Sequence, residues 1–237
     1  MFFLMTPFLT VIMMYILAAV LPALFLLRYV YNCSNNKQPM AYLRYLIYGG
    51  FGAALLAMIP EYLESMFIGT PKSASLSDWA GNFLFVAIVE EGAKFIYLKR
   101  RTWNSPTFIA RFDGITFAVY VSLGFAIFEN IRYVFNYGMG VAAQRAFLAI
   151  PAHMAFAVLM GYFYGRARSY ENHGYHAKAV LAQTAGFASA AALHCAYDTF
   201  ATLSSIETGV EFVLVVAVIY VIVFLLVRQQ ASTDEFV

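Results

Sequence analysis

Two adjacent carboxylates stand inside an otherwise apolar stretch of the chain. Glu90 and Glu91 follow the apolar residues 83–89, and Lys94 comes three and four residues after them. A charged side chain near the centre of a bilayer costs about 2.5–3.5 kcal/mol on insertion scales, so a pair of them needs a partner or a function. The spacing places Lys94 on the same helix face, where it can neutralise one glutamate. The other glutamate is then free to activate a water molecule as a general base, and both are candidates for that role.

Three further apolar stretches also contain ionisable or polar side chains. Glu129 and Asn130 lie in one of them, His153 lies in the next, and His194 and Asp198 lie one helical turn apart in a third. If the stretches cross a membrane in alternating directions, all these side chains fall between its centre and its outer side. Because ionisable residues inside a membrane are usually functional, their convergence on four helices predicts an active site or a transport path.

Carboxylates and neutral imidazoles can together activate water and stabilise an oxyanion. Two histidines with one or two carboxylates also match a catalytic zinc site with an open position, for which His153, His194 and Glu129 are the candidate ligands. A metal-free glutamate mechanism is the alternative. The candidate catalytic residues are Glu90, Glu91, Glu129, His153 and His194, and the candidate supporting residues are Lys94, Asn130 and Asp198.

The composition is that of an integral membrane protein. Of the 237 residues, 62% are hydrophobic and 12% are charged, whereas a soluble domain is typically about 25% charged. The net charge of +2 gives no reason to expect a nucleic-acid partner. Cys33 and Cys195 have neither the spacing of a metal site nor the number needed for a disulfide framework.

Seven stretches are long enough to cross a bilayer, which takes about 20 apolar residues. We therefore expect an all-α, polytopic helical bundle that forms a single transmembrane domain over residues 1–237, with the polar motifs in a core at 78–203. Lysine and arginine concentrate in the loops after the first, third and fifth stretches, which predicts an N-terminus outside and a cytoplasmic C-terminus. The stretches are 7–31, 42–67, 78–98, 112–137, 141–166, 179–203 and 208–227.

Other polar groups have structural interpretations. Asp113, beside a predicted membrane interface, suits the start of a helix. Glu129 and Arg132 are spaced to form an ion pair on one helix. The polar tail 228–237 is expected to be frayed.

In order along the chain, these motifs resemble those of the PrsW family of intramembrane proteases. Glu90-Glu91-Gly92-Ala93-Lys94 resembles that family's EExxK motif. Asp113-Gly114, followed by Gly124–Asn130 with its Phe-x-x-x-Glu-Asn ending, resembles its second motif. His153 falls where the family has an isolated histidine, and His194–Asp198 resembles its last motif. The resemblance covers about residues 78–200 on four predicted helices.

The same motifs resemble, more distantly, those of the type II CAAX prenyl endopeptidases. In those enzymes a glutamate of the first motif activates water, and histidines and an amide assist it. This sequence differs from them in having Lys94 in place of an arginine one position later, Glu129 in place of a histidine, and Asp198 in place of an asparagine.

The resemblance implies a multi-pass intramembrane peptidase, of metalloprotease or glutamate type, in the cell membrane of a bacterium. Its implied cofactor is Zn²⁺, unless the glutamate mechanism holds. Its implied partners are the lipid bilayer and a single-pass membrane protein substrate. The family's best-known role is site-one cleavage of an anti-sigma factor on the extracytoplasmic side.

Two other functional classes are alternatives to a peptidase. One is a non-catalytic membrane scaffold, since a relative in gamma-secretase keeps embedded histidines as a structural subunit. The other is a proton-coupled transporter, because chains of acids and histidines also mark proton paths. The lack of repeat symmetry between the two halves of the sequence argues against the transporter.

Overall fold

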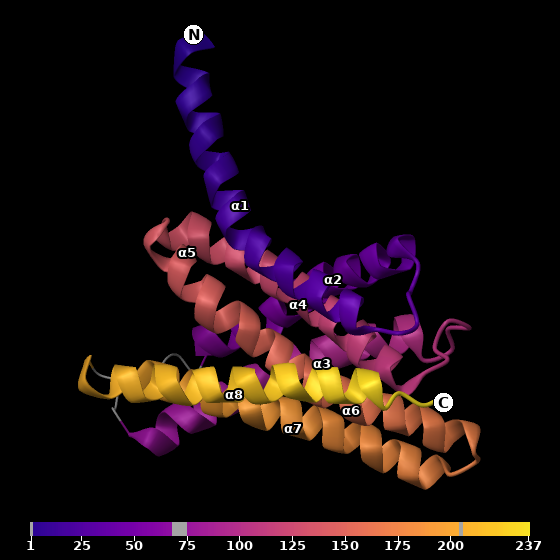
Figure 1. Cartoon of the computed structure of the whole chain (residues 1–237). Coiled ribbons are helices and arrows are strands. Elements are labelled where there is room, and N and C mark those ends of the chain that lie inside the picture. Colours follow the sequence, from indigo (N-terminus) through magenta and orange to yellow (C-terminus); the bar gives the residue numbers. More distant parts are fainter. Residues whose placement is uncertain (1, 68–74, 204–205) are drawn as a thin grey trace.

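The computed structural model describes residues 2–67, 75–203 and 206–237, and Figure 1 shows these ranges as a bundle of helices. Within them the chain forms no strand, apart from one isolated β-bridge between Ala110 and Phe236. The elements are α1 (Phe2–Cys33), α2 (Met40–Phe67), α3 (Leu76–Thr102), α4 (Arg111–Tyr137), α5 (Gly140–Gln144), the π-helical turn η1 (Arg145–Ala149), α6 (Ile150–Asn172), α7 (His176–Leu203) and α8 (Ile206–Ser232).

Among the described residues, six helical segments are long and apolar enough to cross a membrane, which confirms the predicted helical membrane bundle. Helix α3 is not among the six, because its acidic and basic residues lower its hydropathy. The count of seven spans, which includes α3, and the direction of insertion both stay predictions. The six segments are Leu9–Cys33, Met40–Phe67, Arg111–Tyr137, Gly140–Asn172, His176–Leu203 and Gly209–Ser232.

Helix α4 forms the centre of the bundle and packs against α1, α2, α3 and α6. Glycines allow two of these approaches, since a Cβ atom on Gly50 of α2 would overlap the backbone of α4. Likewise, a Cβ atom on Gly114 of α4 would overlap the backbone of α6 at Gly161 and Gly165. Small residues bring helices together in this way where a bilayer supplies no hydrophobic drive between them.

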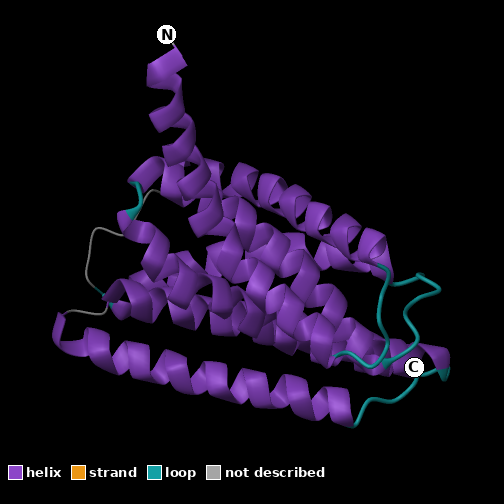
Figure 2. Ribbon diagram, turned by 45° about the horizontal axis from the view of Figure 1, so that its top comes forward, coloured by secondary structure: helices purple, strands orange, loops and turns teal. Residues whose placement is uncertain are grey.

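Helices α1 and α8 lie at the periphery. The first part of α1 extends away from the bundle in Figure 1, and α8 runs along one edge in Figure 2. Two hydrogen bonds join α8 to the end of α1 and the loop after it, from Tyr29 Oη to the Phe224 carbonyl (3.1 Å) and from Asn35 Nδ2 to the Ala231 carbonyl (2.7 Å). Much of the remaining α8 surface is exposed and aliphatic, as expected of a helix that faces lipid.

The expectation of a frayed C-terminal tail is wrong. Helix α8 continues to Ser232, and the last residues pair with the loop before α4 and with the first residues of α4. The Arg111 amide donates to the Glu235 carbonyl (2.9 Å), and the Phe112 amide donates to Asp234 Oδ1 (2.9 Å). The tail stays in place because the first amides of a helix have no partner within it and these residues supply one.

Asp113 supports the start of α4, as predicted. Its carboxylate accepts hydrogen bonds from the amides of Ile109 (3.1 Å) and Ala110 (2.9 Å), and from the side chains of Asn36 (3.0 Å) and Gln38 (2.8 Å). This fully buried carboxylate therefore ties the loop between α1 and α2 to the start of the central helix.

Candidate active site

A cavity of about 510 Å³ lies among the helices and is lined by most of the predicted site residues. Its walls come from α2 to α7, with η1 contributing one corner. Its ionisable lining residues are Glu61, Glu90, Glu129, Arg132, Arg145, His153, His194 and Asp198.

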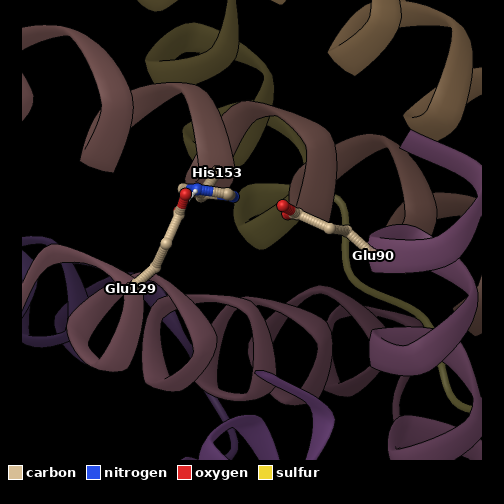
Figure 3. A group of neighbouring side chains, drawn as sticks. All are labelled: Glu90, Glu129 and His153. Atoms are coloured by element: carbon tan, nitrogen blue, oxygen red, sulfur yellow. Dashed lines mark hydrogen bonds and ion pairs between the residues drawn. The ribbon is translucent and has the colours of Figure 1, made fainter. Parts of the chain in front are cut away.

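The predicted convergence of four helices is present in the structure. Glu90 comes from α3, Glu129 from α4, His153 from α6 and His194 from α7. One donor atom from each of Glu90, Glu129 and His153 lies within 4.8 Å of the other two, and Figure 3 shows these side chains pointing toward one another. Glu90, Glu91 and His194 form a second such group, so Glu90 is shared by both.

The two adjacent glutamates have different surroundings. Glu91 is 0% exposed, and its Oε1 accepts hydrogen bonds from Lys94 Nζ (2.7 Å) and His194 Nδ1 (3.0 Å). Glu90 lines the cavity, and its Oε2 lies 3.2 Å from Lys94 Nζ and 4.0 Å from His194 Nε2. Glu91 thus makes two short charged contacts, whereas Glu90 faces the cavity.

The hydrogen bonds of His153 fix its tautomer. Its Nδ1 lies 3.1 Å from Lys94 Nζ, and its Nε2 lies 2.9 Å from Glu129 Oε2. A lysine ammonium has donors only, so Nδ1 accepts and the ring proton is on Nε2, directed at Glu129. His153 is therefore neutral and links Lys94 to Glu129.

His194 lies between two carboxylates. Its Nδ1 is 3.0 Å from Glu91 Oε1, and its Nε2 is 3.1 Å from Asp198 Oδ2. Because a carboxylate only accepts, both ring nitrogens donate and His194 carries a positive charge in this arrangement. The imidazole also stacks on Phe156 of α6, with ring centroids 4.7 Å apart.

Glu129 pairs with a residue that the sequence analysis did not place in the site. Its Oε2 lies 3.0 Å from Arg145 Nη2, where a pair with Arg132 was expected. Arg145 Nε also donates to Asn130 Oδ1, and its guanidinium lies 3.8 Å from the ring centroid of Tyr133. Arg145 begins the π-helical turn, a distortion that is frequent at functional sites. The signal for it in the sequence was a polar dipeptide, Gln144-Arg145, within an apolar stretch.

Glu61 of α2 was also missed. It lines the cavity together with Glu90 and Glu129, and its Oε1 is buried without a hydrogen-bond partner among the described residues. Glu61 lies in the last two turns of α2, so its place in the sequence gives no reason to expect it beside Glu90 and Glu129.

Residues 37–227 match a family described as "PrsW family intramembrane metalloprotease". The chain belongs to this family. It is 34% identical over 160 residues to Protease PrsW of Shouchella clausii, which covers 67% of this chain and 72% of that protein. It is 31% identical over 159 residues to Protease PrsW of Oceanobacillus iheyensis (66% and 70%) and 30% identical over 153 residues to Protease PrsW of Bacillus subtilis strain 168 (64% and 67%). No solved structure shows a significant match.

Membership of the PrsW family confirms the resemblance drawn from the motifs. The chain is a multi-pass membrane protein of a protease family, with bacterial relatives that are themselves named as proteases. This favours a hydrolase over the scaffold and the transporter.

The family description also implies a metal, which the donor atoms fit only in part. His194 suits a ligand only in its neutral form, after Nε2 loses the proton that it donates to Asp198. Its Nδ1 would then still donate to Glu91, and metal-bound histidines usually make such a second hydrogen bond. His153 does not suit one, because its Nδ1 accepts from Lys94 and its Nε2 carries the proton. The predicted ligands therefore do not form a two-histidine zinc centre unless Lys94 moves away.

Proposed function

We propose that this PrsW-family protein hydrolyses a peptide bond of a membrane-anchored polypeptide, with Glu90 as the general base. The observation that supports this most directly is the difference between the two glutamates. Glu91 is held by Lys94 and His194, whereas Glu90 faces a cavity of about 510 Å³ that is large enough for water and a peptide bond.

In this mechanism Glu90 takes a proton from a water molecule while the water oxygen attacks the carbonyl carbon of the scissile bond. The negative charge that develops on the carbonyl oxygen is stabilised by the positive His194, whose Nε2 lies 4.0 Å from Glu90 Oε2. When the carbon–nitrogen bond breaks, Glu90 returns the proton to the leaving amine, so that the carboxylate is restored.

The other polar residues hold these groups in position. Lys94 offsets the charge of both glutamates, and Asp198 stabilises the positive form of His194. Arg145 offsets the charge of Glu129, which in turn orients His153. No step is assigned to a metal, because the Lys94 ammonium already contacts Glu90, Glu91 and His153 and supplies a positive charge among these groups.

The substrate that this arrangement fits is a single-pass membrane protein, and an anti-sigma factor is the specific candidate from the family resemblance. The cavity lies toward the ends of α4 and α7, where Arg132 and Thr202 line it. These ends are extracytoplasmic in the predicted orientation, which supports cleavage on that side of the membrane.

Reconstitution of the purified protein into liposomes tests this function. The liposomes would also contain a panel of single-pass membrane proteins that includes anti-sigma factors, and mass spectrometry would identify the new chain ends. We expect cleavage on the extracytoplasmic side of at least one substrate, and a loss of about 10²-fold or more in Glu90→Gln. The matched control is Glu171→Gln, which changes a glutamate outside the cavity. Cleavage by Glu90→Gln at the parental rate would refute the proposal.

A further inference from the structure

A second cavity, of about 620 Å³, lies between α6, α7 and α8. Its lining is almost entirely apolar, in contrast to the polar cavity beside it. Residues of α6 and α7 form one wall, among them Ala155 and Phe200, and residues of α8 form the other, among them Val215, Val216 and Ile219. No step of the proposed mechanism uses this space.

The apolar cavity adjoins the candidate active site. Ala152, Phe156 and Tyr197 line both cavities and therefore form the partition between them. Phe156 is also the ring that stacks on His194, with centroids 4.7 Å apart and an interplanar angle of 17°. A molecule in the apolar cavity would thus contact a side chain that touches the candidate catalytic histidine.

The size of the cavity limits what it can hold. One turn of an α-helix is about 5.4 Å long and 10–12 Å across with its side chains, so a volume of about 620 Å³ holds little more than one turn. A whole transmembrane helix does not fit. The apolar side chains of a short extended segment do fit, and a peptide bond must leave its helix before its carbonyl can be attacked in the neighbouring cavity.

The cavity reaches the outer surface of the bundle, since two of its lining residues, Phe200 of α7 and Val215 of α8, are exposed. Tyr220 of α8 donates a hydrogen bond to the Leu148 carbonyl in the π-helical turn and so bridges the helices at this cavity. Two other hydrogen bonds to α8, from Tyr29 and Asn35, lie nearer its C-terminal end. Helix α8, which forms one wall of the cavity, runs along one edge of the bundle in Figure 2.

We propose that this cavity binds large apolar side chains of the substrate next to the scissile bond, in an extended segment of its membrane-anchored chain. The inference rests on the proposed function. It makes the cavity a specificity-determining site, so the protein would select substrates with aliphatic or aromatic residues on one side of the cleaved bond. The partition residues would then align the scissile carbonyl with Glu90.

A matched pair of substitutions on α8 tests this site. Val215 and Val218 are both 59% exposed and lie three residues apart, but only Val215 lines the cavity. With a substrate from the liposome panel, we expect Val215→Trp to lower kcat/KM about tenfold or more, because the indole fills the space, and Val218→Trp to stay near the parental value. Serine in place of the apolar residues beside the cleavage site should cause a similar loss in the parental protein. Equal activities of the two tryptophan variants would overturn the inference while leaving the proposed function intact.

A binding experiment covers the case in which Val215→Trp misfolds or no substrate is cleaved. A photoreactive benzophenone amino acid would replace Val215 or Val218 in the Glu90→Gln background. The probe is a biotinylated peptide of leucine and alanine, about 20 residues long and flanked by lysines. We expect cross-linking at position 215 that excess unlabelled peptide competes away, and no such competition at 218. Cross-links at 215 to phospholipid alone would overturn the inference and assign the cavity to a lipid chain.

Discussion

Lys94 Nζ lies 3.1 Å from His153 Nδ1 and also forms ion pairs with Glu90 and Glu91. One buried ammonium group therefore connects the first motif of the chain to its isolated histidine. Its contacts determine which ring nitrogen of His153 carries the proton and which position a metal would have to take.

Replacing Lys94 with methionine should destabilise the protein. The change leaves Glu91 buried with one cationic partner fewer, and breaking a buried ion pair typically costs about 3–5 kcal/mol. Thermal unfolding of the purified protein in detergent would measure the effect. Lys99→Met is the control, since Lys99 is an exposed lysine on the same helix. Equal unfolding temperatures of the two variants would show that the Lys94 contacts contribute nothing to stability.

Lys94→Met should bind more zinc than the parental protein, although it should be less stable. The parental protein is expected to hold substoichiometric zinc after dialysis and to keep its activity in a zinc chelator, because Lys94 occupies His153 Nδ1. Lys94→Met frees that nitrogen and should raise the zinc content, which elemental analysis would measure together with the protein concentration. Stoichiometric zinc in the parent, lost together with its activity, would contradict the metal-free mechanism.

Arg145 should matter more than Arg132. Arg145 contacts Glu129 and Asn130, so Arg145→Met leaves a largely buried carboxylate without its cation, at a cost of roughly 1–3 kcal/mol. Arg145→Lys should recover only part of the lost stability, because an ammonium cannot contact Glu129 and Asn130 in the geometry of a guanidinium. Unfolding temperature and cleavage rate would be compared with those of Arg132→Met. A larger effect of Arg132→Met would support an ion pair between Glu129 and Arg132, as the spacing in the sequence predicts.

The approach of α4 to α6 should be sensitive to a single methyl group. Gly114→Ala places a Cβ atom against the backbone of α6, and overpacking of this kind costs typically about 1–3 kcal/mol. Gly81→Ala is the matched control, since nothing lies within 4 Å of a Cβ atom there. Thermal unfolding should separate the two variants, and a Gly114→Ala protein as stable as Gly81→Ala would argue against this packing.

Asp234 should give the C-terminal tail a dependence on pH. Burial raises the pKa of this carboxyl above its usual value, so the folded protein holds the proton more tightly than the unfolded chain does. As the pH rises through the folded pKa, the carboxyl ionises in its buried site, and this lowers the free energy of unfolding. Below the pKa of the unfolded chain the carboxyl is protonated in both states, and the loss of stability disappears. Asp234→Asn keeps an acceptor for the Phe112 amide and should match or exceed the parent in stability near neutral pH, with the difference shrinking in acid. Unfolding midpoints of the parent and of Asp234→Asn across a pH series would measure this difference. A difference that grew in acid would contradict a raised pKa of Asp234 as its cause.

Chain length, apolar runs and the spacing of charges were enough to predict the helical membrane bundle and the meeting of Glu90, Glu129, His153 and His194. Sequence gives the depth of a residue in a membrane helix but not how the helix is rotated relative to its neighbours. For this reason the partner of Glu129, which lies on another element, and the different surroundings of Glu90 and Glu91 were not predicted. The C-terminal tail was mispredicted for a similar reason, since its partner amides at Arg111 and Phe112 lie more than a hundred residues earlier in the chain.

The most direct test of the central claim compares Glu90→Gln with Glu91→Gln in the same two assays. We predict that Glu90→Gln unfolds near the parental temperature but cleaves at least about 10²-fold more slowly, because it keeps the packing and loses the base. Glu91→Gln should unfold at a clearly lower temperature, because it weakens the buried contacts with Lys94 and His194. Normal turnover in Glu90→Gln, with a parental unfolding temperature and no turnover in Glu91→Gln, would reverse the two roles and contradict the account.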